Sequence, residues 1–226
     1  MNESFKILSL GECALIVTFG NVIDEKINQR VNSLCFALES NPFSGFIEAV
    51  PAYSSLTVFY DNLRVTQNFR HSLTGFEVAK NLIEIEMEKL PMTNSNEGNL
   101  IEIAVNFDSE AALDLDRISE EAELSEQEVI EIFLSHEYRV YMLGFLPGFA
   151  YMGTVDERIA CPRKRTPRTR VPKGSVGIAG RQTGIYPIES PGGWQIIGRT
   201  DQEMFDTITA EIETLLPGDR VKFIAK

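Results

Sequence analysis

The sequence predicts an α+β domain at residues 1–90 and a mainly-β domain at residues 100–226. Strand-like and helix-like segments follow one another through the first 90 residues in the order ββαββα, which predicts two helices on one antiparallel sheet. Residues 91–99, PMTNSNEGN, are polar and aperiodic, which indicates a linker. Residues 144–198 hold ten of the 16 glycines and six of the ten prolines, a density typical of tight turns between short strands.

The first domain begins with strand-like residues. Residues 5–19 hold two apolar runs, FKILSL and ALIVTF, on either side of Gly11-Glu12. Residues 46–60, FIEAVPAYSSLTVFY, indicate two more strands joined near Tyr53-Ser54-Ser55. Runs rich in branched and aromatic residues between turn residues are typical of strands. We therefore expect two strand pairs in this domain.

Two amphipathic helices complete the first domain. Their apolar positions recur at helical spacing, namely Ile27, Val31, Leu34, Cys35 and Leu38 in the first helix and Ala79, Leu82, Ile83, Met87 and Leu90 in the second. Asn21 or Asp24 can cap the first helix. Thr74 and Glu77 form a capping box at the start of the second. Each helix is thus expected to pack on the sheet through one apolar face.

The second domain combines short strands with an acidic helical stretch. Residues 100–105, LIEIAV, indicate a strand, and residues 111–135 are helical, with a capping box at Ser125 and Glu128. The stretch from residue 137 to 226 is rich in strands. Closure of these strands into a barrel is expected because it removes exposed strand edges.

The composition limits the possible functions. No run of about 18 apolar residues is present, so we expect no membrane span. Glu12 interrupts the N-terminal apolar run, which argues against a signal peptide and for a cytoplasmic protein. The cysteines and histidines are few and scattered, at Cys13, Cys35, Cys161, His71 and His136. This argues against a disulfide framework and against a metal site.

Charge is unevenly distributed along the chain. The whole chain carries a net charge of −12, but residues 158–199 contain nine Lys or Arg and one acid, Glu189. This basic segment is therefore +8, and the rest of the chain is −20. Such an acidic protein is not expected to bind nucleic acid through its overall field. The basic segment indicates either a local site for an anion or an acidic partner, or a solvated loop.

Several motifs identify a family. They are YRVYMLGFLPGFAYMG (138–153), PRKRTPR (162–168), VPKGSVGIAGRQTGIYP (171–187), SPGGWQIIGRT (190–200) and LLPGD (215–219), preceded by Gly11-Glu12 and Glu48-Ala49-Val50-Pro51. Over nearly its whole length the chain resembles the family that contains the B subunit of bacterial ATP-dependent 5-oxoprolinase. Members are also described as sensor-kinase inhibitors of the KipI type and as allophanate hydrolase subunit 1.

The resemblance implies a fold and an activity. It implies that the C-terminal domain is a cyclophilin-like β-barrel. It also implies that the chain acts with the C and A subunits of the enzyme to convert 5-oxo-L-proline, ATP and water to L-glutamate, ADP and phosphate. The sequence contains no phosphate-cradling P-loop and no Ser-His-Asp, Cys-His or paired-carboxylate constellation. We therefore expect the chain to be inactive alone and ATP to be bound by the complex.

Two other functions are compatible with the resemblance or the fold. A regulatory protein of the KipI type would inhibit a sensor histidine kinase, docking through its acidic N-terminal portion or through the barrel loops. A prolyl isomerase is suggested by the barrel alone, but a fold does not carry a function, and the motifs of the chain are not those of that enzyme.

The sequence departs from the family pattern at four places. A family histidine ahead of the Glu-Tyr pair corresponds to Phe133, and His136 follows three residues later. Lys173 stands where the family has alanine, and residues 106–110 (NFDSE) replace a glycine-rich turn. Near the C-terminus, Phe205-Asp206-Thr207 replaces the family's FDP. The first departure bears on catalysis if the family histidine has a chemical role.

Arg163 and Arg168 match the family motif within the basic segment. Guanidinium groups bind carboxylates and phosphates through two parallel hydrogen bonds. We therefore expect these two residues to contact an anion or a partner. The alternative is a structural salt bridge to the acidic remainder of the chain. Arg199 is a third candidate for anion binding.

Gln182, Thr183 and Tyr186 surround a glycine turn and offer an amide, a hydroxyl and a phenol. Such a set can bind a small polar ligand or the backbone of the barrel itself. The single tryptophan, Trp194, follows a turn and is expected in the core.

The motif GFLPGF contributes three further candidates. Phe145, Pro147 and Phe149 could form the interface with the C subunit, or they could close one end of the barrel. Exposed aromatic residues are typical of interfaces, and buried ones are typical of a core.

Overall fold

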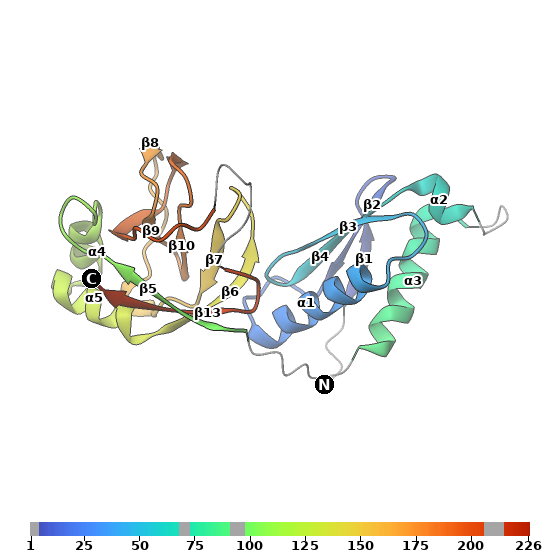
Figure 1. Ribbon diagram of the computed structural model, residues 1–226, viewed down its shortest axis with the longest axis horizontal. Helices are drawn as coiled ribbons and strands as arrows, with labels where there is room; N and C mark the ends of the chain where they lie inside the picture. Colours follow the sequence, from blue (N-terminus) through green and yellow to red (C-terminus); the bar gives the residue numbers. More distant parts are fainter. Residues whose placement is uncertain (1–4, 68–72, 91–97, 206–214) are drawn as a thin grey trace. The chain divides into compact units, whose positions relative to one another are not determined.

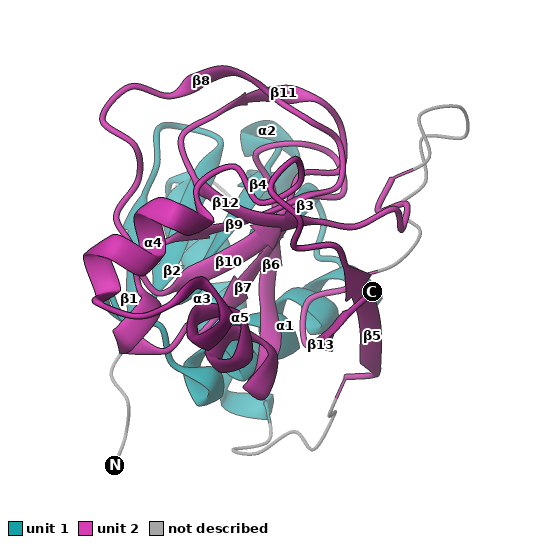
Figure 2. Ribbon diagram, turned by 90° about the vertical axis from the view of Figure 1, so that its left-hand side faces the viewer, with its two compact units in different colours: residues 1–96 teal, residues 97–226 magenta. Residues whose placement is uncertain are grey.

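The computed structural model describes residues 5–67, 73–90, 98–205 and 215–226. The chain divides into two compact units, Met1–Asn96 and Glu97–Lys226, which Figure 2 colours teal and magenta. The division falls within the expected linker, of which residues 91–97 lie outside the described residues.

Unit 1 is an antiparallel sheet with helices (Figure 1). Its elements are β1 (Lys6–Ser9), β2 (Ala14–Thr18), α1 (Glu25–Ser40), β3 (Phe46–Pro51), β4 (Ser55–Tyr60), α2 (Asn62–Thr66) and α3 (Gly75–Lys89). The strands lie in the order β1-β2-β4-β3, and every neighbouring pair is antiparallel. The predicted ββαββα order is therefore confirmed, apart from the short helix α2.

Local signals explain the helices of unit 1. The side chain of Asp24 accepts a hydrogen bond from the backbone of Ile27 and so caps α1. Thr74 and Glu77 form the expected capping box at the start of α3. The short helix α2 was not predicted, although Asp61 caps it by accepting hydrogen bonds from two backbone N–H groups. Both long helices bury one face against alternate positions of the sheet, such as Leu56.

Unit 2 holds one helical pair and the remaining strands. Its elements are β5 (Leu100–Val105), α4 (Leu115–Ala122), α5 (Glu126–Ser135), β6 (Glu137–Leu143), β7 (Ala150–Gly153), the 3-10 helix η1 (Glu157–Ile159), β8 (Arg168–Val171), β9 (Ser175–Ala179), β10 (Gln182–Ile185), β11 (Ser190–Gly192), β12 (Gln195–Arg199) and β13 (Arg220–Ala225). The helical stretch expected at 111–135 is two helices, broken at Glu123, whose φ is 54°. Ser125 and Glu128 then form the expected capping box of α5.

Seven strands of unit 2 form one sheet that closes on itself. Their order is β12-β9-β10-β7-β6-β13-β5, and β5 is parallel to its neighbour β13. The two edge strands β12 and β5 meet at one bridge between Asn106 and Arg199. Each residue donates its backbone N–H to the carbonyl of the other, at 2.8 and 2.9 Å. This bridge joins the two edges of the sheet, which is therefore nearly closed, as a barrel requires.

A stack of aromatic rings packs α5 against this sheet. The ring of Phe133, from α5, lies 5.0 Å from the ring of Tyr138 and 4.9 Å from that of Phe223, measured between centroids. All three side chains are fully buried. The Tyr138 hydroxyl donates a hydrogen bond to the carbonyl of Phe133. The stack fastens α5 to the barrel through β6 and β13.

Candidate functional site

The cations of the basic segment fall into two groups. Most form ion pairs with acids, namely Arg158 with Asp156, Lys164 and Arg168 with Asp114, Arg170 with Glu189, Lys173 with Glu203, and Arg181 with Glu157. Among the described residues, Arg163, Arg165 and Arg199 form no ion pair with a carboxylate. The structural alternative therefore holds for Arg168, and Arg163 is left as a cation available to a ligand.

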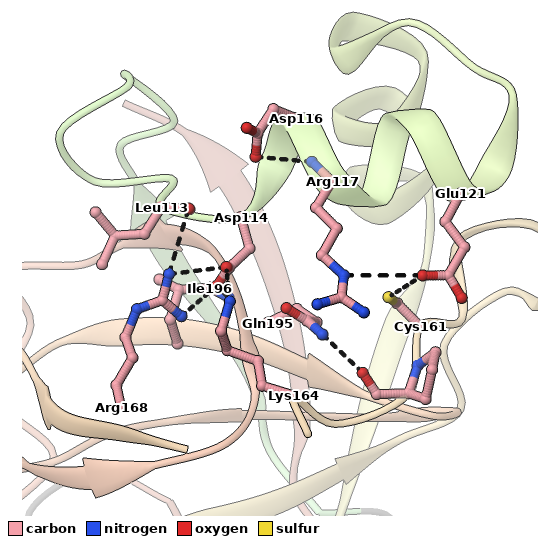
Figure 3. Close-up of polar contacts among 11 residues, drawn as sticks. Leu113, Asp114, Asp116, Arg117, Glu121, Cys161, Lys164, Arg168, Gln195 and Ile196 are labelled. Atoms are coloured by element: carbon pink, nitrogen blue, oxygen red, sulfur yellow. Dashed lines mark hydrogen bonds and ion pairs between the residues drawn. The ribbon is translucent and has the colours of Figure 1, made fainter. Parts of the chain in front are cut away.

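Asp114 is the centre of the strongest of these clusters (Figure 3). Its carboxylate accepts two hydrogen bonds from the Arg168 guanidinium, at 2.6 and 2.8 Å, and one from Lys164 Nζ at 2.7 Å. The backbone N–H of Ile196 donates a fourth at 2.7 Å. The Asp114 side chain is 3% exposed. We call these residues, Asp114, Lys164, Arg168 and Ile196, the Asp114 cluster.

Two opposing effects act on the pKa of Asp114. Burial alone would raise this pKa, because a low-dielectric surrounding disfavours the charged form. The hydrogen bonds from Arg168, Lys164 and the Ile196 backbone outweigh burial and hold the pKa below its ordinary value. Asp114 therefore stays ionised at neutral pH. Although it stands directly before α4, its side chain makes no capping hydrogen bond there.

The Asp114 cluster and two further contacts fix the course of the chain around residues 162–168. The Gln195 side chain donates to the carbonyl of Pro162 at 2.8 Å. The backbone N–H of Lys164 donates to the carbonyl of Gly193 at 2.7 Å. Arg163 lies between these two anchor points. Its position is therefore set by β12 and the turn before it.

Arg163 lines a small pocket of about 240 Å³. The pocket is lined by Phe145, Tyr151, Arg163, Pro167, Tyr186, Pro191, Gly192, Gly193 and Trp194. We call it the aromatic pocket. Its volume lies below the roughly 300 Å³ at which pockets for drug-sized ligands begin. It therefore suits a small molecule.

A cluster of rings supports the pocket from beneath. Phe149 is 1% exposed and packs against the rings of Tyr186 and Trp194, with centroids 5.3 and 5.4 Å apart. Trp194 is 4% exposed, so its expected place in the core is confirmed. Of the two roles considered for Phe149, its burial favours packing within the barrel over a contact at an interface. Phe149 supports Phe145, whose ring centroid lies 5.6 Å away.

Glycine at position 192 is required by the wall of the pocket. A Cβ atom there would lie 2.4 Å from the hydroxyl oxygen of Tyr186 and 2.8 Å from its ring. Real atoms do not approach so closely, so a side chain would displace the phenol. The glycine thus lets Tyr186 reach the pocket between two backbone segments.

Arg163 also sets the electrostatics of the pocket. Its guanidinium carbon lies 5.7 Å from the ring centroid of Trp194, within the range of a cation–π contact. Burial raises the pKa of Tyr151 and of Tyr186, and the positive charge of Arg163 opposes this rise in both. Both phenols are therefore protonated at neutral pH.

Besides Arg168, Pro147 and Phe149, three further predicted site residues lie outside the lining of the aromatic pocket. Thr183 is fully buried and donates its hydroxyl to the carbonyl of Gly177 at 3.0 Å, which is the second of the two roles considered for it. Gln182 is half-buried at the start of β10. Arg199 contributes its backbone to barrel closure, and its charge helps to lower the pKa of Asp108, after the hydrogen bond from Asn106.

The structure shows where several of the residues that depart from the expected family pattern lie. Phe133 belongs to the buried aromatic stack, and Lys173 pairs with Glu203 on the surface. His136 ends α5, with Nδ1 3.0 Å from the carbonyl of Ile132 and Nε2 3.6 Å from the Asp156 carboxylate. Residues 206 and 207 lie outside the described residues.

Sequence reasoning missed Asp114 and Tyr151. Asp114 was hidden because its partners are separated from it by 50 to 82 positions. A weak signal was available, since an acid between Leu113 and Leu115 is unusual at the start of an apolar helix face. Tyr151 lay inside a recognised motif, but only the fold brings it beside Trp194.

Comparison with known proteins identifies the family. The family model for the carboxyltransferase domain, subdomain C and D, matches residues 5–216. The chain belongs to this family. It is 41% identical over 225 residues to the B subunit of 5-oxoprolinase from Bacillus subtilis, covering 99% of this chain and 94% of that protein. It is 37% identical over 215 residues to the protein of the same name from Escherichia coli O157:H7, covering 95% and 93%.

Solved structures agree with this assignment. A conserved uncharacterized protein from Pyrococcus horikoshii is 43% identical, with a TM-score of 0.53, and 98% of this chain and 97% of that chain are covered. A longer solved protein, 34% identical, gives a TM-score of 0.79, but this chain spans only 40% of it. The urea amidolyase of K. lactis, at 20% identity and a TM-score of 0.80, shares the fold; all of this chain and 15% of that one are covered.

Two negative findings concern only the described parts of the chain. Within residues 5–67, 73–90, 98–205 and 215–226, no helix has the length and apolar character needed to cross a bilayer. Among the same residues, no group of three or more His, Cys, Asp or Glu side chains is placed to hold a metal ion.

Proposed function

We propose that the chain is the B subunit of an ATP-dependent 5-oxoprolinase and that it acts only together with partner subunits. The observation that carries the proposal is the 41% identity to the B subunit of a 5-oxoprolinase over almost the full length of both proteins. Two further curated relatives of the same name, from Escherichia coli O157:H7 and Haemophilus influenzae, are each 37% identical over most of their length.

The proposed reaction converts 5-oxo-L-proline, ATP and water to L-glutamate, ADP and phosphate. A lactam is stabilised by resonance, and transfer of a phosphoryl group to its oxygen would activate it for attack by water. Such a step needs cations that stabilise the spreading negative charge. In this chain most cations of the basic segment are already paired with acids, so ATP is expected to bind to a partner subunit. This chain would contribute substrate binding.

The partners are proposed to be the C and A subunits of the same enzyme. The exposed side chains of Phe145, which is 62% exposed, and Pro147 are candidate contacts for the C subunit. Aromatic residues on a surface are enriched at protein interfaces.

An omission assay tests the proposed function. We expect ATP hydrolysis that depends on 5-oxo-L-proline when this chain is co-expressed with candidate A and C subunits, and none when any one is left out. The purified chain alone is expected to be inactive. Full activity without this chain, or substantial activity from the chain alone, would contradict the proposal. Size-exclusion chromatography of the assembled complex serves as the control that the subunits are folded and associated.

A further inference from the structure

The aromatic pocket has one cation and no neutralising acid. Arg163 is the one charged side chain among the described residues that line it. The nearby Lys164 and Arg168 are both paired with Asp114, whereas no described carboxylate forms an ion pair with Arg163. A guanidinium without a counter-ion at the edge of a cavity is a site for an anion.

The walls of the pocket restrict what that anion can be. Trp194, Tyr151 and Tyr186 present ring surface to a space of about 240 Å³. Ring surface favours a flat, largely apolar body. Both phenols are protonated, and the hydroxyl of Tyr186 can donate a hydrogen bond. A polyphosphate would offer these ring faces no apolar surface to pack against, whereas a small ring compound with one carboxylate would use both the ring faces and Arg163.

The rim of the pocket carries a strained residue. Phe145 has a φ of 64°, in the left-handed region that bulky side chains rarely adopt. Its ring is 62% exposed although it lines the pocket. Strained residues of this kind cost about 1–3 kcal/mol and concentrate at ligand sites. The conformation holds an apolar edge at the pocket mouth, where a bound ring could cover it.

We infer that the aromatic pocket binds a small cyclic monocarboxylate, with its carboxylate on Arg163 and its ring against Trp194. This inference rests on the proposed function to the extent that the ligand is the lactam substrate, 5-oxo-L-proline. The lactam ring is flat, its carbonyl can accept a hydrogen bond from a phenol, and its carboxylate is its one charge. Arg163 and Trp194 thereby select the substrate by charge and shape.

The single tryptophan makes binding directly measurable. Because Trp194 is the only tryptophan of the chain and lines the pocket, its fluorescence reports occupancy of this site. We expect 5-oxo-L-proline to change the emission of the purified chain saturably. The uncharged ring 2-pyrrolidinone, which lacks the carboxylate, is expected to bind at least about tenfold more weakly, the fold-change that corresponds to about 1.4 kcal/mol.

Arg163→Gln and Arg165→Gln form a matched pair of variants. Each removes one exposed positive charge that no described carboxylate neutralises, but only Arg163 lines the pocket. We expect Arg163→Gln to raise the Kd for 5-oxo-L-proline at least about tenfold and to leave the affinity for 2-pyrrolidinone unchanged. Arg165→Gln should leave both unchanged. In the assembled enzyme, Arg163→Gln should raise the KM for 5-oxo-L-proline by a similar factor.

The outcomes separate this inference from the proposed function. If the assembled enzyme hydrolyses ATP with 5-oxo-L-proline while Trp194 emission is unaffected and Arg163→Gln leaves KM unchanged, the pocket inference is overturned and the proposed function stands. If 5-oxo-L-proline binds at Trp194 but no complex is active, the reverse holds. Equal effects of Arg163→Gln and Arg165→Gln would mean that 5-oxo-L-proline is attracted by positive charge in general and is not bound in this pocket. That result would also overturn the inference.

Discussion

Replacement of Asp114 by asparagine is expected to destabilise unit 2 by about 3–5 kcal/mol, the usual cost of removing one partner from a buried ion pair. The Asp114 carboxylate is 3% exposed and accepts four hydrogen bonds from Lys164, Arg168 and Ile196. An amide would accept fewer of these and would leave two cations, 21% and 24% exposed, without a counter-charge. The expected loss of stability therefore includes the free-energy cost of keeping both cations partly buried without a counter-charge.

Urea unfolding followed by Trp194 fluorescence measures this effect, because Trp194 lies in unit 2. Asp116→Asn is the matched control, since Asp116 is an exposed acid in the first turn of the same helix. It should cost no more than about 1 kcal/mol, through the helix dipole. A loss for Asp114→Asn that is no larger than the loss for Asp116→Asn would mean that the cluster contributes nothing to stability beyond a surface charge.

The stabilisation that the Asp114 carboxylate provides should also depend on pH. Its folded-state pKa is lowered, so the stabilisation is fully present above the ordinary aspartate pKa of about 3.9. It is lost as the pH falls through the lower folded-state value, because the proton must then be bound in both states. The difference in unfolding free energy between wild type and Asp114→Asn should therefore be constant from about pH 7 to about pH 5 and shrink below about pH 4. A difference that grows on acidification would contradict this assignment of the charge.

Local features of unit 1 and of the helices could be predicted from sequence because each depends on residues a few positions apart. The capping boxes at Thr74 and Ser125 and the alternation of buried residues along β4 are of this kind. The helix α2 was missed because its five residues are too few to show an apolar period. The break at Glu123 was missed because a left-handed residue that is not glycine leaves no sequence signal.

The candidate site could be predicted only in part, since its contacts join distant segments. Sequence placed Arg163, Tyr186 and Trp194 in motifs without showing that they share one cavity. It also offered two roles for Arg168, and only the position of Asp114, 54 residues away, distinguishes them. Barrel closure was expected in general, but nothing in the sequence pairs Asn106 with Arg199. Long-range pairing is decided by the packing of the whole sheet.

Phe133→Ala is expected to cost about 3–5 kcal/mol, because the ring is fully buried between Tyr138 and Phe223 and its removal leaves a cavity. Phe133→Leu keeps most of the volume and should cost less than about 1.5 kcal/mol. Leu216→Ala, at a side chain that is 60% exposed in the same unit, should stay within about 0.5 kcal/mol. Urea unfolding again provides the measurement, and a loss for Phe133→Ala as small as that for Leu216→Ala would show that the stack does not hold α5 to the barrel.

Phe133→His separates a packing role from a chemical role at the position where the resemblance to the family implies a histidine. An imidazole between the buried rings of Tyr138 and Phe223 would have a lowered pKa, because burial disfavours its charged form. The variant should then lose stability as the pH falls below about 6.5, since the unfolded chain binds a proton that the folded chain excludes, with a slope of up to about 1.4 kcal/mol per pH unit. In the assembled enzyme we expect Phe133→Leu to keep the wild-type kcat. A Phe133→His variant with unchanged stability and a higher kcat would instead place this position in the chemistry. Phe133 would then stand where a catalytic group has been lost.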